Sequence, residues 1–338
     1  MSETGRLAAI FGCSAAVLSA DERAFFRDTD PFGFILFARN IETPDQLRRL
    51  TADLREAVGR DAPILIDQEG GRVQRMRAPH WREWSPPLDA AKAAGVDAAR
   101  VLGLRARIIA EELRAVGIDA NCAPVADIAS PETHPFLRNR CYGETVAQVC
   151  ERALAVAKAH LAAGVLPVVK HLPGHGRATA DTHHDLPTVT ASREELAAQD
   201  FAPFRALADL PMAMTAHIIF AAYDADRPAT QSPVMIDVIR QEIGFQGLLM
   251  TDDLNMQALS GDLGTRTRRA MAAGCDIALH CKGDMAEMRQ VAREAGELTT
   301  AARARATAAL ALRKGHSPVD IAALEADLVR MGQGALYG

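Results

Sequence analysis

The residues best suited to chemistry gather in one segment of the chain. Residues 170–187 read KHLPGHGRATADTHHDLP and contain four of the ten histidines, a lysine and two aspartates. Two glycines and two prolines in the same stretch rule out a regular helix, so the segment is predicted to be a loop. Because imidazole and carboxylate groups transfer protons near neutral pH, we expect the chemistry of the protein here.

Within this loop, the pair formed by Asp181 and His183 has the spacing of a proton-transfer device. An aspartate two residues before a histidine in a tight turn can accept a hydrogen bond from the imidazole, fix its tautomer and stabilise its protonated form. His184 comes next and is expected to point elsewhere. The alternative interpretation is a surface turn without chemistry.

A second candidate site is the pair of carboxylates in LLMTDDLNM, residues 248–256. An apolar run delivers Asp252 and Asp253 at its polar end, where a buried carboxylate needs a partner or a function. Adjacent residues of an extended chain point in opposite directions, so only one of the two can face a common site. The pattern alone does not say which. Alternatively, both carboxylates only cap the turn that follows.

The third motif, DQEGGRVQR at residues 67–75, stands at the end of the third apolar run. Asp67 can accept two hydrogen bonds from sugar hydroxyls and Arg75 can donate several. Gly70 and Gly71 allow backbone or ligand to approach closely. An ion pair between Asp67 and Arg75 that holds the loop is the alternative, and it is compatible with binding.

Further hydrogen-bond donors come from Lys170, His171 and Arg140, for which the sequence shows no obvious balancing acceptors. Such donors suit a hydroxyl-rich neutral ligand or an anionic group. For Arg140 the alternative is a solvated surface charge.

The elements that must position these residues alternate along the chain. Eight short apolar runs are predicted to be strands: Leu7–Ser14, Gly33–Ala38, Pro63–Asp67, Asp119–Ala126, Val165–His171, Met212–Ile219, Gly247–Asp252 and Cys275–His280. Helical patterns between them cover Pro44–Val58, Ala90–Val116, Glu144–Ala163, Arg193–Leu207, Pro233–Ile243 and Thr265–Ala273. Capping-box patterns begin two of these helices, at Thr43 with Gln46 and at Ser192 with Glu195.

Eight such units predict an α/β protein with a single-domain (β/α)8 barrel, the TIM-type fold, over residues 1–338. The Ala-rich helical segment 284–338 is expected to pack on the barrel exterior. An open doubly wound sheet is the alternative, but no GxGxxG follows the first run.

A barrel carries its active site at the carboxyl ends of its strands, so the polar residues that follow the runs become candidates. These are Arg39, Asn40, Asp67, Gln68, Glu69, Asp127, Lys170, His171, His217, Asp252, Asp253 and His280. We expect them to converge on one mouth.

Composition excludes several classes of function. The net charge of −5 and the scattered arginines give no basic stripe for a nucleic acid. No apolar run approaches the roughly 20 residues of a membrane span. The six cysteines show no CxxC pair or metal spacing, which predicts reduced thiols in the cytoplasm. Residues 7–20 resemble the apolar part of a signal peptide. A first strand is the preferred interpretation, because the acidic Glu3 is unusual in the basic segment that begins a signal peptide. We expect a monomer, although no feature fixes the oligomeric state.

Taken together, KHLPGHG…DTHHDLP, DQEGGRVQR, MTAHIIF (residues 214–220) and MTDDLNM resemble glycoside hydrolase family 3, in particular its single-domain bacterial β-N-acetylhexosaminidases of cell-wall recycling. The resemblance spans residues 7 to about 300. It implies a (β/α)8 barrel and a nucleophile at Asp252 rather than Asp253. It further implies that His183 is the proton donor and acceptor and that Asp181 orients it. The positions that match the sugar-binding residues of the family are Asp67, Arg75, Arg140, Lys170 and His171.

The activity implied is hydrolysis of a β-linked N-acetylglucosamine from the non-reducing end of a peptidoglycan fragment, such as GlcNAc–anhydromuramyl peptide, through a covalent glycosyl-aspartate. Most retaining glycosidases pair two carboxyl groups. Here a histidine would replace one of them. No metal or organic cofactor is implied.

Three other functions compete with this one. A histidine acid/base would not repel phosphate, so the same site could act as a phosphorylase. A barrel that only senses amino sugars would not need Asp252, Asp181 and His183 together. A metal-dependent hydrolase would use His171, His175, His183 and His184, but Pro173 and Gly174 prevent the helix that would align the first two.

Overall fold

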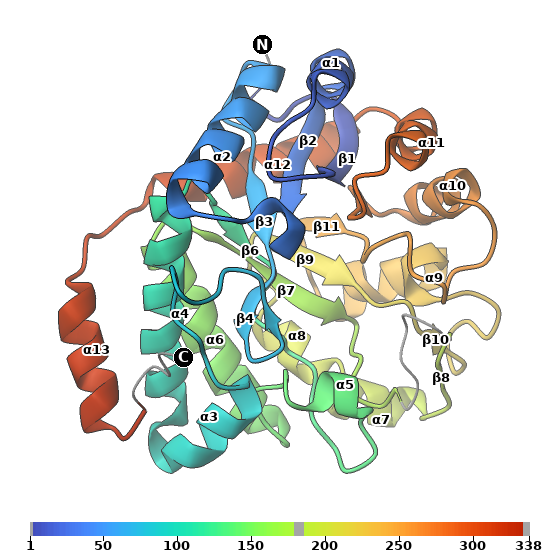
Figure 1. Ribbon diagram of the computed structural model, residues 1–338. Coiled ribbons are helices and arrows are strands. Elements are labelled where there is room, and N and C mark those ends of the chain that lie inside the picture. Colours follow the sequence, from blue (N-terminus) through green and yellow to red (C-terminus); the bar gives the residue numbers. More distant parts are fainter. Residues whose placement is uncertain (1–2, 179–185, 334–338) are drawn as a thin grey trace.

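The computed structural model describes residues 3–178 and 186–333, and its centre is a barrel of parallel strands (Figure 1). The strands are β1 (Leu7–Gly12), β2 (Pro31–Leu36), β3 (Ile64–Ile66), β6 (Ala120–Asn121), β7 (Leu166–Leu172), β9 (Met212–Thr215), β11 (Leu248–Met250) and β12 (Ala278–His280). Their order is β11-β9-β7-β6-β3-β2-β1-β12. Each lies within or next to one of the eight predicted runs.

The two edge strands of this sheet meet and close the barrel. Met250 and Ile277 form a parallel bridge. The amide of Ile277 donates to the carbonyl of Leu249 at 3.2 Å, and the amide of Thr251 donates to the carbonyl of Ile277 at 3.0 Å. The predicted (β/α)8 barrel is therefore confirmed.

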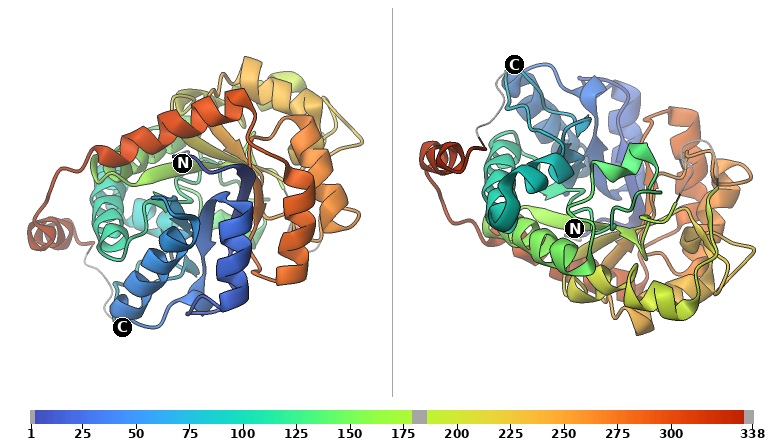
Figure 2. Two further views of the ribbon diagram at one scale, coloured as in Figure 1. Left: turned by 90° about the horizontal axis from the view of Figure 1, so that it is seen from above. Right: turned by 90° about the horizontal axis from the view of Figure 1, so that it is seen from below.

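Helices surround the barrel in both further views (Figure 2). They are α1 (Ala20–Thr29), α2 (Pro44–Val58), α3 (Pro87–Ala94), α4 (Ala98–Ala115), α5 (Pro135–Arg138), α6 (Val146–Ala162), α7 (Arg193–Ala198), α8 (Ala202–Ala206), α9 (Pro233–Asp237), α10 (Leu263–Ala273), α11 (Met285–Ala295), α12 (Thr300–Ala311) and α13 (Ile321–Arg330). The short strands β4 (Gln68–Gly70) and β5 (Val73–Gln74) form a hairpin, and β8 (Thr188–Val189) pairs with β10 (Ile219–Phe220).

Three helical predictions were too long. Ala90–Val116 is two helices, because Gly95 adopts φ 56°, outside the helical region. Arg193–Leu207 also breaks in two, with Pro203 in the first turn of α8, where its missing N–H costs nothing. In Pro233–Ile243, α9 gives way to a π-helical turn at Val238–Glu242.

Of the two predicted capping boxes, one forms completely and the other only in part. Ser192 and Glu195 form the full capping box of α7. At α2 only half of the box forms: Thr43 accepts from the amide of Gln46, but the side chain of Gln46 accepts from Glu42.

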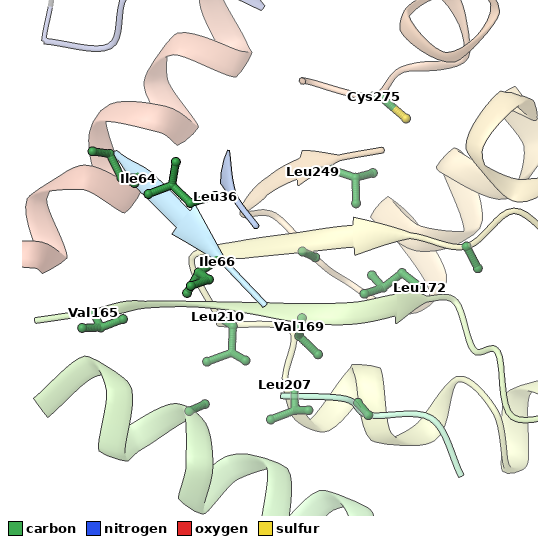
Figure 3. Packing of buried hydrophobic residues seen from close by; sticks show 14 of the residues in the cluster. Leu36, Ile64, Ile66, Val165, Val169, Leu172, Leu207, Leu210, Leu249 and Cys275 are labelled. Atoms are coloured by element: carbon green, nitrogen blue, oxygen red, sulfur yellow. The ribbon is translucent and has the colours of Figure 1, made fainter. Parts of the chain in front are cut away.

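Two hydrophobic layers result from the alternation of side chains along the strands. One fills the barrel and includes Ile10, Leu65 and Val168. The other lies between the strands and the helices; Figure 3 shows Val165, Val169 and other members of it. Helix α12 contributes residues to the inner layer, including Ala302 and Ala306, so it covers one end of the barrel interior.

Partly buried ion pairs attach α12 and its continuation to the barrel. Arg305 Nη1 lies 2.8 Å from Asp276 Oδ1, and Arg240 binds the other oxygen of that carboxylate at 2.7 Å. Arg313 reaches Asp119. Helix α13 lies beside α4 at the edge of the molecule (Figure 1). Within the described residues, no helix combines the length and the hydropathy that a membrane crossing requires.

Candidate active site

A pocket of about 370 Å³ opens where the carboxyl ends of the strands converge. Polar residues after β3, β7 and β11 share it with apolar residues of the strands and their loops. Its lining includes Asp67, Arg72, Arg75, His134, Phe136, Arg140, Lys170, His171, His175, Asp252, Asp253 and Cys281. Residues from positions 67 to 281 thus meet in one cavity.

The first cluster in the pocket is built around Asp67. Lys170 Nζ lies 2.7 Å from Asp67 Oδ1, and Arg75 Nη2 lies 3.1 Å from Asp67 Oδ2. Burial alone would raise the pKa of Asp67, but the charges of Lys170 and Arg75 lower it well below its usual range. The aspartate is therefore ionised, and it keeps acceptor capacity for hydroxyl groups. The ion pair with Arg75 that the sequence allowed is present.

Glu69 forms the second cluster. Its carboxylate makes a two-point contact with Arg140, at 2.9 Å to Nε and 2.8 Å to Nη2, and also lies 2.7 Å from Lys170 Nζ. Burial would raise the pKa of Glu69, but Arg140 and Lys170 lower it to about 2. The sequence interpretation of Lys170 and Arg140 as donors without acceptors was therefore wrong. Arg140 is also no solvated surface charge, since its side chain is only 11% exposed.

Asp127 is the acid that pairs with His171, as Glu69 is for Arg140. Its Oδ2 lies 2.7 Å from His171 Nδ1, and its Oδ1 accepts from the amide of His175 at 2.7 Å. Burial opposes ionisation of Asp127, yet His171 and the hydrogen bonds lower its pKa. Because an ionised Asp127 only accepts, the hydrogen of this contact lies on Nδ1 of His171. The other ring nitrogen, Nε2, then faces Arg140 Nη2, 3.4 Å away. His171 is thus held in one orientation.

The two adjacent carboxylates after β11 have different environments. Asp252 Oδ1 accepts from the amide of Asp253 at 2.8 Å. Burial would raise the pKa of Asp252, but the imidazoles of His217 and His171 and this amide lower it overall. Asp253 instead binds the amides of Asn255 and Cys281, each at 3.2 Å. Burial raises the pKa of Asp253 to about 6.

Comparison with known proteins agrees with this geometry. A family model described as the glycosyl hydrolase family 3 N terminal domain matches residues 11–310. The chain belongs to glycosyl hydrolase family 3. It is 39% identical over 273 residues to a beta-hexosaminidase of Methylococcus capsulatus, covering 78% of this chain and 79% of the relative. It is 34% identical over 301 residues to a beta-hexosaminidase of Stenotrophomonas maltophilia, covering 87% and 89%.

Solved structures give the same family 3 fold. NagZ from Neisseria gonorrhoeae in complex with N-trifluoroacetyl-D-glucosamine superposes with a TM-score of 0.83 at 28% identity, over 98% of this chain and 96% of that one. A family 3 beta-N-acetylglucosaminidase from Paenibacillus gives a TM-score of 0.81 at 32% identity. It covers 93% of this chain, which spans 63% of the length of that protein.

The structure brings together six of the predicted site residues of this family 3 barrel: Asp67, Arg75, Arg140, Lys170, His171 and Asp252. The other two, His183 and Asp181, lie outside the described residues, as does His184.

Four other members of the predicted ring of polar residues, Arg39, Asn40, His217 and His280, contact the protein rather than the pocket. Arg39 and Asn40 donate to the carbonyl of Cys13. His217 and His280 are fully buried. Arg39, Asn40 and His217 follow strands as predicted, whereas His280 is the last residue of β12. The expectation that the whole ring converges on one mouth is met only in part, because these four residues do not line the pocket.

Glu69 and Asp127 are the residues to which the sequence interpretation gave no role. Both stood in the predicted ring. Glu69 is two positions after Asp67 and so can share its side of an extended chain. The surplus of donors at Lys170 and Arg140 was the signal that acids were missing nearby.

Among residues 3–178 and 186–333, no group of three His, Cys, Asp or Glu side chains is arranged to hold a metal ion. His171 and His175 are near each other, with ring centroids 5.4 Å apart. Nδ1 of His171 already binds the carboxylate of Asp127, so this nitrogen has a partner other than a metal ion. Two of the four histidines of the metal-dependent alternative, His183 and His184, belong to the segment that is not described.

Proposed function

We propose that this family 3 protein is a retaining β-N-acetylhexosaminidase that removes a terminal β-linked N-acetylglucosamine. The observation that carries the proposal is that the carboxylate of Asp252 shares one pocket with the buried, paired polar groups of Asp67, Arg75, Arg140, Lys170 and His171. Relatives at 34–39% identity bear the name beta-hexosaminidase, which supports the same activity.

Asp252 is the nucleophile. Its carboxylate attacks the anomeric carbon, the bond to the leaving oxygen breaks, and a glycosyl ester forms. The lowered pKa of Asp252 keeps it ionised at neutral pH. Asp253 is less suited to this role, because two backbone amides occupy its carboxylate and burial raises its pKa to about 6.

His183 donates a proton to the departing oxygen, and in its neutral form activates the water that hydrolyses the ester. Asp181 orients the imidazole. These two assignments come from the family pattern and from the spacing of the two residues. Proton transfer of this kind contributes roughly 10²–10⁴-fold to the rate.

The sugar is held by Asp67, Arg75, Lys170, Arg140 and His171. Because the charges in this array are paired internally, the site suits a neutral ligand rich in hydroxyl groups. Asp67 accepts from hydroxyls, while Lys170 and the guanidinium groups donate. The natural substrate that we propose is a peptidoglycan fragment of the GlcNAc–anhydromuramyl-peptide type, processed during cell-wall recycling.

We place this reaction in the cytoplasm, carried out by a monomer without a metal or organic cofactor. The six free cysteines, four of them buried, suit a reducing compartment. Subcellular fractionation and light scattering of the purified protein test these two statements.

The decisive experiment is trapping of the covalent intermediate. A 5-fluoro N-acetylglucosaminyl fluoride is incubated with the enzyme, and the labelled peptide is mapped by mass spectrometry. We expect the label on Asp252, and we expect Asp252→Asn to lose both labelling and turnover of an aryl β-N-acetylglucosaminide. Asp253→Asn is the matched control and should still be labelled at Asp252. Label on Asp253 would overturn the assignment.

The same preparation separates the competing functions. GlcNAc-1-phosphate formed in phosphate buffer would identify a phosphorylase. Binding of N-acetylglucosamine without turnover would identify a sensor. Loss of activity with a chelator and its return with zinc would identify a metal-dependent hydrolase.

A further inference from the structure

A completely buried histidine lies behind the proposed nucleophile. His217 lies two residues after the last residue of β9 in the sequence, and it is 0% exposed. Its Nε2 lies 3.0 Å from the backbone carbonyl of Asp253, and its Nδ1 lies 2.7 Å from Thr230 Oγ1. It therefore links the end of β9 and the short helix at Ala229–Gln231 to the turn that carries Asp252.

The carbonyl partner fixes the direction of the hydrogen bond at Nε2 of His217. A carbonyl oxygen only accepts, so Nε2 must carry a hydrogen and donate it to Asp253. Burial lowers the pKa of His217, and the charge of the nearby Asp252 carboxylate opposes this shift. Nδ1 lies against the hydroxyl of Thr230, which itself donates to the carbonyl of Ala216 at 3.0 Å. Thr215 Oγ1, 2.8 Å from Thr230 Oγ1, supplies a hydrogen to the Thr230 oxygen in turn.

This contact completes the immobilisation of Asp253. Its amide donates to Asp252 Oδ1, and its carboxylate binds the amides of Asn255 and Cys281. Its carbonyl accepts from His217 and, within the turn, from the amide of Met256 at 3.1 Å. All three polar groups of Asp253 are thus engaged. Since the amide of Asp253 binds Asp252 directly, a shift of the Asp253 peptide would move the nucleophile.

We propose that His217 is a positioning residue, which holds the Asp253 carbonyl through its Nε2–H and so directs the Asp252 carboxylate at the anomeric carbon. The inference rests on the proposed function only in taking Asp252 as the nucleophile. His217 is not a proton donor to substrate, because both of its ring nitrogens bind protein groups and the side chain is fully buried.

The test compares two substitutions at one position. His217→Leu removes the donor, whereas the amide of Gln in His217→Gln places an N–H close to the position of Nε2. Misplacement by about 1 Å costs on the order of 10² in rate, so we expect His217→Leu to lower kcat about 100-fold. KM should stay within about threefold, since the sugar-binding groups are untouched. His217→Gln should recover at least about tenfold of this loss.

The rate of labelling of Asp252 by the fluoro sugar gives a second readout. It should fall in parallel with kcat in His217→Leu and recover in His217→Gln. Thr230→Val, which removes the hydroxyl in contact with Nδ1 of His217, should lower kcat in the same direction. Thr267→Val is the matched control, because Thr267 is an equally buried threonine whose hydroxyl only binds the carbonyl of Leu263.

The outcomes separate the inference from the proposed function. If Asp252→Asn keeps its activity, the proposed function fails. If Asp252→Asn is inactive while His217→Leu keeps kcat once corrected for the folded fraction, only the role of His217 fails. A change in KM alone would also overturn it. Should His217→Leu not fold, kcat and the labelling rate of Thr230→Val decide the question.

Discussion

The guanidinium of Arg140 and the carboxylate of Glu69 form two parallel hydrogen bonds, of 2.9 Å and 2.8 Å, although the residues are 71 positions apart. The side chain of Glu69 has no exposed surface, and that of Arg140 is 11% exposed. Two-point contacts of this kind fix orientation as well as charge. The pair therefore joins the β4–β5 hairpin to the segment after α5 and holds Arg140 in the pocket.

Substitution of Glu69 by Gln should be costly for stability. It leaves Arg140 buried without its acid and removes one of the two acids that Lys170 binds. Removing one partner of a buried pair costs about 3–5 kcal/mol. Urea denaturation measures the loss. Glu144→Gln is the matched control, because its pairs with Lys92 and Arg138 are exposed and worth about 0–1 kcal/mol. Equal effects of the two substitutions would contradict this interpretation.

Gly70 should not accept a side chain. It has φ 104°, and a Cβ there would lie 1.6 Å from Arg105 Nη2, the atom that donates to the carbonyl of Glu69 at 2.7 Å. Gly70→Ala should therefore cost more than the roughly 1–2 kcal/mol of a left-handed residue and should lower activity as well. Gly244→Ala is the control, because Gly244 has φ 84° with nothing within 4 Å of its Cβ position. Thermal unfolding of both variants gives the comparison.

Asp67 should matter for substrate binding. Its carboxylate lies in the pocket, 15% exposed, and a hydrogen bond to a charged group contributes about 1.5–3 kcal/mol. Asp67→Ala should thus lower kcat/KM on an aryl β-N-acetylglucosaminide about 10- to 100-fold or more. Unchanged kcat/KM would remove Asp67 from the site. Asp61→Ala is the control, since Asp61 is a surface residue, 73% exposed, outside the pocket lining.

Stability should decline as the pH falls below neutrality, in part because of His160. Burial lowers the pKa of His160 to about 4, while the unfolded chain has a pKa near 6.5. Between these values the unfolded state binds more protons, so stability is present above pH 6.5 and is lost toward pH 4. His160→Gln should flatten the slope by at most about 1.4 kcal/mol per pH unit.

The measurement is urea unfolding at several pH values. Asp253 provides a check of opposite sign, because its pKa is raised to about 6 and protonation stabilises its folded form as the pH falls. Asp253→Asn should therefore make the decline steeper. A His160→Gln slope identical to that of the original protein would show that His160 does not contribute.

The C-terminal helices should differ in importance. Ala302 and Ala306 of α12 belong to the layer inside the barrel, whereas α13 is attached at the surface, in part through Arg82 and Glu325. A chain that ends after residue 315 should fold with reduced stability. A chain that ends after residue 296 should not fold, because the barrel interior would be open to water. Circular dichroism and Tm of both truncations test this expectation.

Local patterns in the sequence determined the elements of the barrel. Apolar runs of five to eight residues predicted all eight strands, because burial on both faces of a parallel strand leaves a continuous apolar signal. The N-cap of α2 at Thr43 and the capping box of α7 at Ser192 were predicted for the same reason: they depend on residues three positions apart. The predicted barrel also placed the polar residues after the strands at one mouth, and Asp67, Lys170, His171, Asp252 and Asp253 of that set do line one pocket.

Partners far apart in sequence could be decided only by the tertiary structure. Nothing near Lys170 indicates that both Asp67 and Glu69 neutralise it, nor does anything near His171 indicate Asp127. The difference between Asp252 and Asp253 likewise depends on amides at positions 255 and 281 and on the imidazole of His217. The physical reason is the distance along the chain over which each effect acts. Propensity and periodicity act within a few residues, whereas the charge state of a buried group is set by whichever atoms the folded chain brings within about 4 Å of it.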